Sequence, residues 1–534
     1  MSATSVDQVR DWRARLGHRP GRVGIAFLGA ALLVGAGSST PSPPQAGSAP
    51  PEIAANAVSG WPAHNFDLSN TRADLNSNIN ASNVSTLKPL WTFKLANAEA
   101  YGAFTTNPLV LGGQVYFENP ESDVFDLDQS TGALVWEHKY NSAAPSGGPN
   151  GVAIGYGLLF GVTESSTFAL NARTGQQVWI HKLTSRRNEG IDMAPLVYSD
   201  KVLVSTIPGN STSFYTGGAY GIVYALNAQT GNTVWTFSTI KGGKQLWGDP
   251  KVNGGGGLWY PPAVDSAGRV FLGVGNPSPV YPSASDPNAK SRPGPNLYTD
   301  SLVVLNGSTG TLLWYRQVTP HDIRDYDFQD SPIISTEDVN GVPTEIVIGA
   351  GKSGKVVAFV ASSGERLWTL NIGKHNKYEY GGLPPKPVTY CPGSLGGVVT
   401  PMAQSGSTLY VPWVDWCYKG KATGLTGYSK VATGGLAAVN AATGAVEWKH
   451  LFKDLDVGAA TVADNVVFTS TFNGTIYALS ATSGLVLWSA KAPVGINSFP
   501  AVSQNMLIVG AGAPTSAKKQ TKGVLIAYSL EGGP

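Results

Sequence analysis

A hairpin-sized motif recurs along most of this chain, and the recurrence limits the folds that the chain can adopt. Each copy consists of a short apolar strand, a polar turn that ends in Thr-Gly or Ser-Gly, and a tryptophan four residues after the glycine. The stretch VFDLDQSTGALVW, for example, recurs as TFALNARTGQQVW and as TIYALSATSGLVLW. Seven copies are marked by their tryptophans, which are Trp136, Trp179, Trp235, Trp314, Trp368, Trp448 and Trp488.

Each copy predicts a β-hairpin with one buried face, because apolar and polar residues alternate along its strands. The glycine suits the left-handed position of the turn, and the tryptophan can pack against the next unit. An eighth copy is split between the chain ends: LKPLWTFKL supplies Trp91, and GVLIAYSLEGG supplies the strand and the turn. We therefore predict an all-β, eight-bladed β-propeller with tryptophan-docking repeats over residues 59–534, in which N- and C-terminal strands close one blade. An open solenoid is the alternative, but it would need capping repeats at both ends.

Composition agrees with short strands and tight turns. Glycine is abundant, at 65 residues, while charged residues make up only 13% and leave little material for amphipathic helices. The formal net charge of +2, without a basic stripe, excludes a nucleic-acid binder.

The N-terminal segment has the pattern of an export signal. Several arginines between Arg10 and Arg22 precede an apolar run from Gly24 to Gly37. Residues 1–38 are therefore expected to be a signal peptide, or alternatively an uncleaved membrane anchor through residues 23–37. Residues 39–58 are rich in Ser and Pro and predict a disordered linker. We expect an exported protein, located in the periplasm, in the cell envelope or outside the cell, that meets a membrane only through such an anchor.

The chain contains two cysteines, Cys391 and Cys417. In an exported protein such a pair favours one disulfide, and two buried free thiols are the alternative.

Four further motifs lie between the repeats. They are GGGGLWYPPAVD with the following LGVGNPSP, then TPHDIRDYDFQDSP, GAGKSGKVVAFV, and YCPGSLGG with the later WVDWC. With these motifs the chain resembles, from about Trp61 to its C-terminus, the quinoprotein (PQQ-dependent) alcohol dehydrogenase family, which includes methanol and polyvinyl alcohol dehydrogenases.

The resemblance implies a role for each matching residue. Trp259 would form the floor on which pyrroloquinoline quinone stacks. Asn276, Asp325 and Asp327 would bind Ca²⁺ or a lanthanide, Asp327 matching the extra aspartate of lanthanide-using members. Asp325 would also be the catalytic base, and Lys352 would hydrogen-bond the reactive quinone carbonyl. Cys391 and Cys417 match a family disulfide.

Elementary chemistry is consistent with these roles. Hard cations prefer carboxylate and amide oxygens, a carboxylate can accept the proton of an alcohol, and a lysine can stabilise a developing oxyanion. Each residue also has an ordinary explanation, since Trp259 can be a packing residue and Asn276 part of a turn before proline. Asp325 can likewise be an exposed turn carboxylate and Lys352 a surface lysine.

Two functions of different classes remain open. The first is an exported PQQ-dependent dehydrogenase that oxidises a small or polymeric alcohol. Its electrons would pass to a separate acceptor such as a cytochrome, because the sequence has no C-x-x-C-H haem site. The second is a non-catalytic propeller that serves as a binding or assembly scaffold. Departures from the family favour the second: a cysteine pair, a cofactor-gripping arginine, a metal-binding glutamate and a pocket glutamate are replaced by Asn150-Gly151, Tyr156, Thr216 and Thr105.

Overall fold

Strands make up nearly all of the regular structure in this chain. The computed structural model describes residues 47–56, 59–95, 104–105, 107–142, 148–186, 188–209, 215, 217–513 and 523–531. The predicted signal or anchor, residues 1–38, lies outside the described residues. No helix within the described ranges combines the length and the apolar character needed to cross a membrane.

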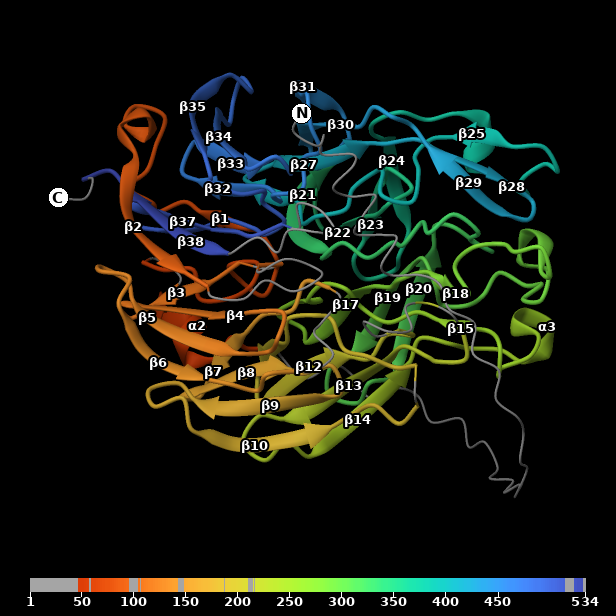
Figure 1. Cartoon of the computed structure of the whole chain (residues 1–534), viewed down its shortest axis with the longest axis horizontal. Helices are drawn as coiled ribbons and strands as arrows, with labels where there is room; N and C mark the ends of the chain where they lie inside the picture. The colour runs from red at the N-terminus through yellow and green to blue at the C-terminus, as the bar shows by residue number, and fades with distance from the viewer. Residues whose placement is uncertain are drawn as a thin grey trace.

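In these described ranges the strands form eight sheets of four or five strands, numbered here in chain order (Figure 1). Sheets 1–4 comprise β3 (Leu109–Leu111), β4 (Gln114–Glu118), β5 (Val124–Asp128) and β6 (Leu134–His138); β7 (Ala153–Gly155), β8 (Leu158–Val162), β9 (Ser166–Asn171) and β10 (Gln177–Lys182); β11 (Leu196–Tyr198), β12 (Lys201–Ser205), β13 (Ile222–Asn227) and β14 (Thr233–Ser238); and β16 (Ala263–Val264), β17 (Arg269–Gly273), β19 (Ser301–Asn306) and β20 (Leu312–Gln317).

Sheets 5–8 continue this pattern to the C-terminus. They comprise β21 (Ile333–Val339), β22 (Val342–Ala350), β23 (Lys355–Val360) and β24 (Arg366–Asn371); β26 (Ala403–Ser405), β27 (Thr408–Asp415), β30 (Thr433–Asn440) and β31 (Val446–Phe452); β1 (Ala73–Asp74), β32 (Thr461–Ala463), β33 (Val466–Ser470), β34 (Thr475–Ser480) and β35 (Val486–Lys491); and β2 (Lys88–Lys94), β38 (Val524–Ser529), β37 (Met506–Ala511) and β36 (Ala501–Ser503).

Smaller elements decorate these sheets. They are the pair β15 (Gly254–Gly255) and β18 (Pro277–Ser278), the three strands β25 (Val388–Tyr390), β28 (Tyr418–Lys421) and β29 (Gly424–Tyr428), the helices α2 (Pro51–Asn56) and α3 (Lys244–Trp247), and the 3₁₀ turns η1 (Val84–Thr86), η2 (Pro287–Ala289) and η3 (Lys377–Glu379).

The two ends of the chain meet in sheet 8. Strand β2 pairs antiparallel with β38, with Trp91 opposite Ala527 and Phe93 opposite Leu525. Both strands are labelled in Figure 1, where β2 lies beside the strands of the C-terminal end. Because β2 follows the N-terminal segment and β38 is the last strand, this sheet joins residues more than 400 positions apart in the sequence.

Each repeat tryptophan bonds to the following sheet. The indole N–H groups donate to carbonyl oxygens over 2.9 to 3.2 Å, in the order Trp91 to Gln129, Trp136 to Ala172, Trp179 to Ala228, Trp235 to Gly307, Trp314 to Ala361, Trp368 to Ala441, Trp448 to Ala481 and Trp488 to Leu87. The last contact runs from sheet 7 to the residue before β2, and the first from sheet 8 to sheet 1. These contacts therefore lead from every sheet to the next and return to the start.

Gly310 tests how tightly one such contact is packed. Its φ is +72°, and a Cβ added there would lie 2.6 Å from the ring of Trp235. Alanine at Gly310 is expected to lower the free energy of unfolding by about 2–4 kcal/mol, through left-handed strain and overpacking together.

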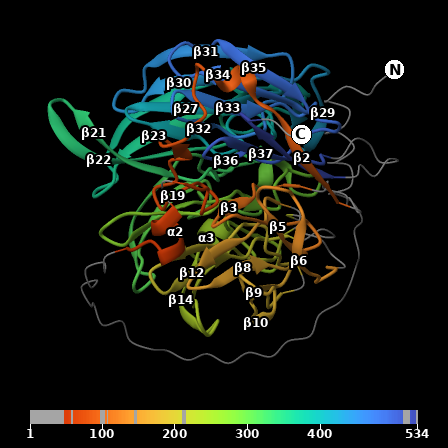
Figure 2. The ribbon, with the colours of Figure 1, turned by 90° about the vertical axis from the view of Figure 1, so that its left-hand side faces the viewer.

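Gly341 is the matched control, since its φ is +84° but a Cβ there would have no atom within 4 Å. It lies between β21 and β22, which extend from the body of the molecule in Figure 2. Alanine at Gly341 should cost only the strain, about 1–2 kcal/mol, as measured by urea denaturation. Equal losses at the two positions would contradict tight packing of Trp235.

The structure corrects the predicted linker at its C-terminal end. Residues 51–56, which the sequence assigns to a disordered stretch, form helix α2. Its Glu52 carboxylate accepts the backbone N–H groups of Tyr156 and Gly157 over 2.8 and 2.6 Å. These partners are about 100 residues away along the chain, so composition alone gave no sign of them.

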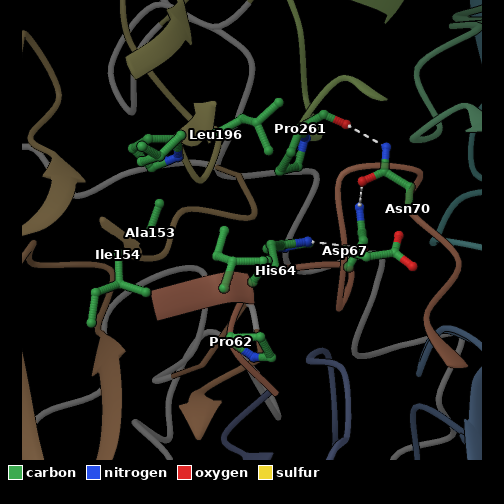
Figure 3. Close-up of a pocket in the computed structure, with 13 residues that line it drawn as sticks. Pro62, His64, Asp67, Asn70, Ala153, Ile154, Leu196 and Pro261 are labelled. Carbon is green, nitrogen blue, oxygen red and sulfur yellow. Dashed lines mark hydrogen bonds between the residues drawn. The ribbon is translucent and has the colours of Figure 1, made fainter. Parts of the chain in front are cut away.

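Next to α2, the segment from Trp61 to Asp74 is packed inside the molecule. Figure 3 shows part of this segment, with Pro62, His64, Asp67 and Asn70 labelled. They face Ala153 and Ile154 of β7, Leu196 of β11, and Pro261. Burial, and then the charge of Arg72, lower the pKa of His64 to about 3, so that its ring is neutral at physiological pH. Arg72 is fully buried.

Cys391 and Cys417 form a disulfide, which confirms the predicted pairing over the free-thiol alternative. It links the residue after β25 to the segment after β27, beside the aromatic cluster of Tyr390, Trp416 and Tyr418.

Candidate active site

Four chain segments of sheets 4 and 5 bring the predicted site residues together. Trp259 precedes β16, and Asn276 follows β17. Asp325 and Asp327 lie between β20 and β21, and Lys352 follows β22. These positions are at strand ends or in connections, where side chains are free to project away from the sheet ladder.

Lys352 holds the two aspartates. Its ammonium Nζ lies 2.9 Å from Asp325 Oδ1 and 2.5 Å from Asp327 Oδ2. Its backbone N–H also donates to the carbonyl of Asp327 over 2.9 Å. Asp325 and Lys352 are 6% and 9% exposed, so neither is the surface residue that the ordinary explanation would have made it.

Asn276 joins the cluster through its backbone. Its N–H donates to Asp327 Oδ1 over 2.6 Å, and its side-chain amide donates to the carbonyl of Pro277 over 2.8 Å. Asp327 is completely buried. One oxygen of its carboxylate thus faces Asn276 and the other faces Lys352.

Burial raises the pKa of Asp327 to about 7, against the opposing effect of the Lys352 charge, and the neighbouring Asp325 raises it further. One lysine therefore does not fully balance two carboxylates. Such a site gains from additional positive charge, since a buried anion without compensation is costly.

Trp259 forms one wall of the cluster. Its ring centre is 5.8 Å from Lys352 Nζ, and the ring of Tyr215 lies nearly parallel, at 9°, with the two centres 5.9 Å apart. Added Cβ atoms would lie 3.0 Å from the indole at Gly148 and 3.2 Å from it at Gly275. The half-buried indole thus has glycine neighbours and already carries one flat ring, which suits the stacking of a planar group.

Two residues at this site gave no signal in the sequence. The hydroxyl of Tyr281 donates to Asp325 Oδ2 over 3.1 Å, although Tyr281 belongs to a long connection without a recognisable motif. Asp300 is fully buried, and within the described residues neither carboxyl oxygen has a hydrogen-bond partner. Burial, followed by the charges of Asp322 and Asp327, raises its pKa well above the usual range.

The positions that depart from the family lie in different places. Asn150 is buried, where its side chain accepts a hydrogen bond from Thr105 Oγ1 and donates to Glu118 Oε1, each over 3.0 Å. Tyr156, expected where a cofactor-gripping arginine would stand, is instead in the exposed turn between β7 and β8, against α2. In that turn the Tyr156 hydroxyl donates to the carbonyl of Ser199, which follows β11. Thr216 lies outside the described residues.

The residues present fit a hard cation in their chemistry, with two carboxylates and an amide gathered around buried, incompletely balanced charge. Among the side chains that the structure describes, no three of the types His, Cys, Asp and Glu are grouped to hold a metal ion. Asp325, Asp327 and Asn276 would supply the oxygen donors of such a site.

Comparison with known proteins agrees with this geometry. Residues 61–375 match the family PQQ, "Glucose/ethanol/alcohol dehydrogenase, beta-propeller domain", and residues 432–533 match "Outer membrane protein assembly factor BamB". The quinoprotein alcohol dehydrogenase PedH of Pseudomonas putida is 27% identical over 492 residues, covering 79% of this chain and 80% of PedH. The quinohemoprotein alcohol dehydrogenase of Comamonas testosteroni is 26% identical over 510 residues, covering 82% of this chain and 70% of that protein.

Solved structures show the same fold. The crystal structure of the Comamonas testosteroni enzyme gives a TM-score of 0.78 at 23% identity and covers 90% of this chain and 82% of that one. A europium-containing methanol dehydrogenase gives 0.75 at 21% identity, covering 90% of this chain and all of the other, at 100%. The predicted all-β propeller fold is thereby confirmed. With more than half of its length matched, the chain belongs to the PQQ-type glucose, ethanol and alcohol dehydrogenase β-propeller family, a family of oxidoreductases.

Proposed function

We propose that this protein is an exported, PQQ-dependent dehydrogenase that oxidises an alcohol. The observation that carries the proposal is the meeting of Asp325, Asp327 and Lys352 beside the flat face of Trp259, within 2.5 to 5.8 Å of Lys352 Nζ. A base, a charge-stabilising cation and a stacking surface are what the oxidation of an alcohol by a bound quinone requires.

Each side chain has a role in this proposal. Trp259 holds the quinone by stacking, and Asn276, Asp325 and Asp327 hold Ca²⁺ or a lanthanide. A quinone bound there would supply the acceptor for the hydride of the alcohol carbon. Asp325 takes the hydroxyl proton, and Lys352 stabilises negative charge on the quinone oxygen.

The acceptor and the location belong to the same proposal. PedH and the Comamonas testosteroni protein are named as quinoprotein and quinohemoprotein alcohol dehydrogenases. Because this chain lacks a C-x-x-C-H haem motif, its electrons pass to a separate carrier such as a cytochrome. Residues 1–38 direct export or anchor the protein, which acts in the periplasm, in the cell envelope or outside the cell.

The eight sheets form the eight blades of one closed ring. Supporting this are the pairing of β2 with β38 and the series of tryptophan contacts that returns from Trp488 to Leu87. Closure leaves no exposed sheet ends and gives the segments of sheets 4 and 5 a rigid frame.

Reconstitution of the purified protein tests the function. We expect saturable binding of the quinone in the presence of Ca²⁺ or La³⁺, followed by dye-linked oxidation of one or more of methanol, ethanol, 2-propanol and polyvinyl alcohol. The metal-free mixture is the control. Failure of the quinone to bind with either ion would contradict the proposal.

The match of residues 432–533 to an assembly factor favours one alternative, a non-catalytic scaffold. The same reconstitution separates the two, because a scaffold needs neither quinone nor metal.

Tyr281 is expected to position the base. Tyr281→Phe removes its hydrogen bond to Asp325 and should lower kcat about tenfold with KM unchanged, since a hydrogen bond to a charged group contributes about 1.5–3 kcal/mol. Steady-state kinetics measure both constants. Tyr140→Phe is the control, because the Tyr140 hydroxyl bonds instead to Gln177 in sheet 2. An equal loss in the two variants, or a change in KM alone, would contradict positioning.

A further inference from the structure

A cationic groove of about 660 Å³ lies between sheets 4 and 5, away from the site described above. One wall is β20, and the other is the β23–β24 hairpin, followed by Tyr380 (Figure 1). Its polar lining is formed by Arg316, Gln317, Lys355, Arg366, Thr369, Asn371 and Tyr380, and it contains no carboxylate. Its volume falls within the range of small-molecule sites.

Strand register explains why these residues share one face. In the β23–β24 hairpin, Lys355 is opposite Asn371, Val357 is opposite Thr369, and Phe359 is opposite Arg366. Alternate residues of a strand point to the same side, so the three pairs line the groove in succession. Lys355 and Arg366 therefore stand about 13 Å apart along the hairpin, separated by apolar Val357 and Phe359.

This interface lacks the aromatic pair found at the same place in three other interfaces. In sheet 5 the docking Trp368 is opposite Ala358, and Val357 is the residue before Ala358. The equivalent position in sheets 1, 2 and 7 holds Phe125, Phe168 and Tyr477. Those rings pack against aromatic residues of the preceding sheet, at centre distances of 6.0, 4.4 and 4.7 Å. In sheet 5 this position is the valine that lines the groove, and it is also aliphatic in sheets 4, 6 and 8, as Val303, Ala437 and Ile526.

The opposite wall differs in the same way. Two residues after Trp91 the chain has Phe93, which packs on Phe125, whereas two residues after Trp314 it has Arg316. The Arg316 guanidinium donates to the carbonyls of Tyr315 and Ser363 over 2.8 and 3.0 Å. An aromatic contact is thus replaced by a charge.

The positive charges of the groove form no salt bridge within the part of the chain that the structure describes. Among the described residues, Arg316, Lys355 and Arg366 form no ion pair with a carboxylate. Lys355 instead contacts the ring of Tyr380, 4.8 Å from its centre. The neighbouring Glu379 is occupied by His375, 2.5 Å away. Burial lowers the pKa of Lys355, the charge of Glu379 opposes this effect, and the charge of Arg366 adds a smaller lowering.

We propose that this groove binds a small organic dicarboxylate. One carboxylate meets the two arginines, whose planar guanidinium groups suit carboxylates, and the other meets Lys355 beside Tyr380. The connecting carbon chain lies along Val357 and Phe359. The apolar floor of Val357 and Phe359 and the separation between the arginines and Lys355 together favour a dianion with an apolar middle over a compact anion such as phosphate.

Calorimetric titration of the full chain without quinone tests the site. Succinate, adipate, suberate, hexanoate and inorganic phosphate are the probes. At least one of the two longer dicarboxylates should bind saturably to one site per chain and more tightly than hexanoate or phosphate. Arg366→Gln should weaken this binding at least tenfold. Lys355→Met should do so as well, while leaving hexanoate binding unchanged.

Arg173→Gln is the control variant, since Arg173 is an exposed arginine of a repeat turn in sheet 2, outside the groove. It should bind like the original protein. The proposal is overturned if no dicarboxylate saturates the protein, if phosphate binds as tightly, or if Arg366→Gln and Lys355→Met leave the affinity intact. Because the titration needs no quinone, its outcome is independent of the dehydrogenase activity.

Discussion

Replacing Asp325 with asparagine is expected to lower kcat for alcohol oxidation by about 10²- to 10⁴-fold, the usual contribution of a general base. Asparagine keeps the size of the side chain and one oxygen, but it cannot take the hydroxyl proton of the alcohol. The remaining carboxylate of the cluster, Asp327, is completely buried and held by Asn276 and Lys352, so it is poorly placed to take over. Steady-state dye-linked kinetics measure the loss.

Two measurements separate loss of the base from loss of the site. Titration of the Asp325→Asn variant should still detect binding of the quinone and the metal, because Trp259, Asn276 and Asp327 are unchanged. Asp249→Asn, at an exposed position between α3 and β15, should keep full activity. If Asp325→Asn retains more than a tenth of kcat while binding the quinone, Asp325 is not the base.

The repeat predicted most of the architecture because its residues act locally. A glycine at left-handed φ and a tryptophan four positions later define one hairpin, as at Gly310 and Trp314. The tryptophan then needs only the following sheet as a packing partner. The prediction failed at α2, because the helix is held by Glu52 on the β7–β8 turn, a contact that no local pattern encodes.

The site was predictable only where a motif carried it. Asp325, Asp327 and Lys352 lie in recognisable segments, and the structure brings them into contact. Tyr281 reaches Asp325 from a connection of irregular structure, where neither periodicity nor spacing constrains the side chain. Tyr156 lies in the exposed turn between β7 and β8, a placement that its match to the family did not indicate.

Arg72→Met is expected to lower the free energy of unfolding by about 3–5 kcal/mol, the cost of leaving strong buried partners unsatisfied. Arg72 is fully buried, and its guanidinium joins three distant parts of the chain. It donates to the carbonyls of Ala460, His64 and Pro500 over 2.7, 3.0 and 3.1 Å. Burial lowers its pKa to about 9, so the group remains charged at neutral pH.

The size of this effect follows from what methionine cannot supply. Methionine fills part of the volume, but the three carbonyls would lose their donor in a space closed to water, and Thr461 would lose a hydrogen bond of 2.6 Å. Because these groups belong to the N-terminal segment and to sheets 7 and 8, the substitution should loosen the region where the chain ends meet. Urea denaturation measures the loss, with Arg173→Met as the exposed control, expected within about 0.5 kcal/mol of the original protein. A loss below about 1 kcal/mol for Arg72→Met would mean that the segment from Trp61 to Asp74 is held mainly by its apolar packing, through Trp61 and Phe66, and not by the buried guanidinium.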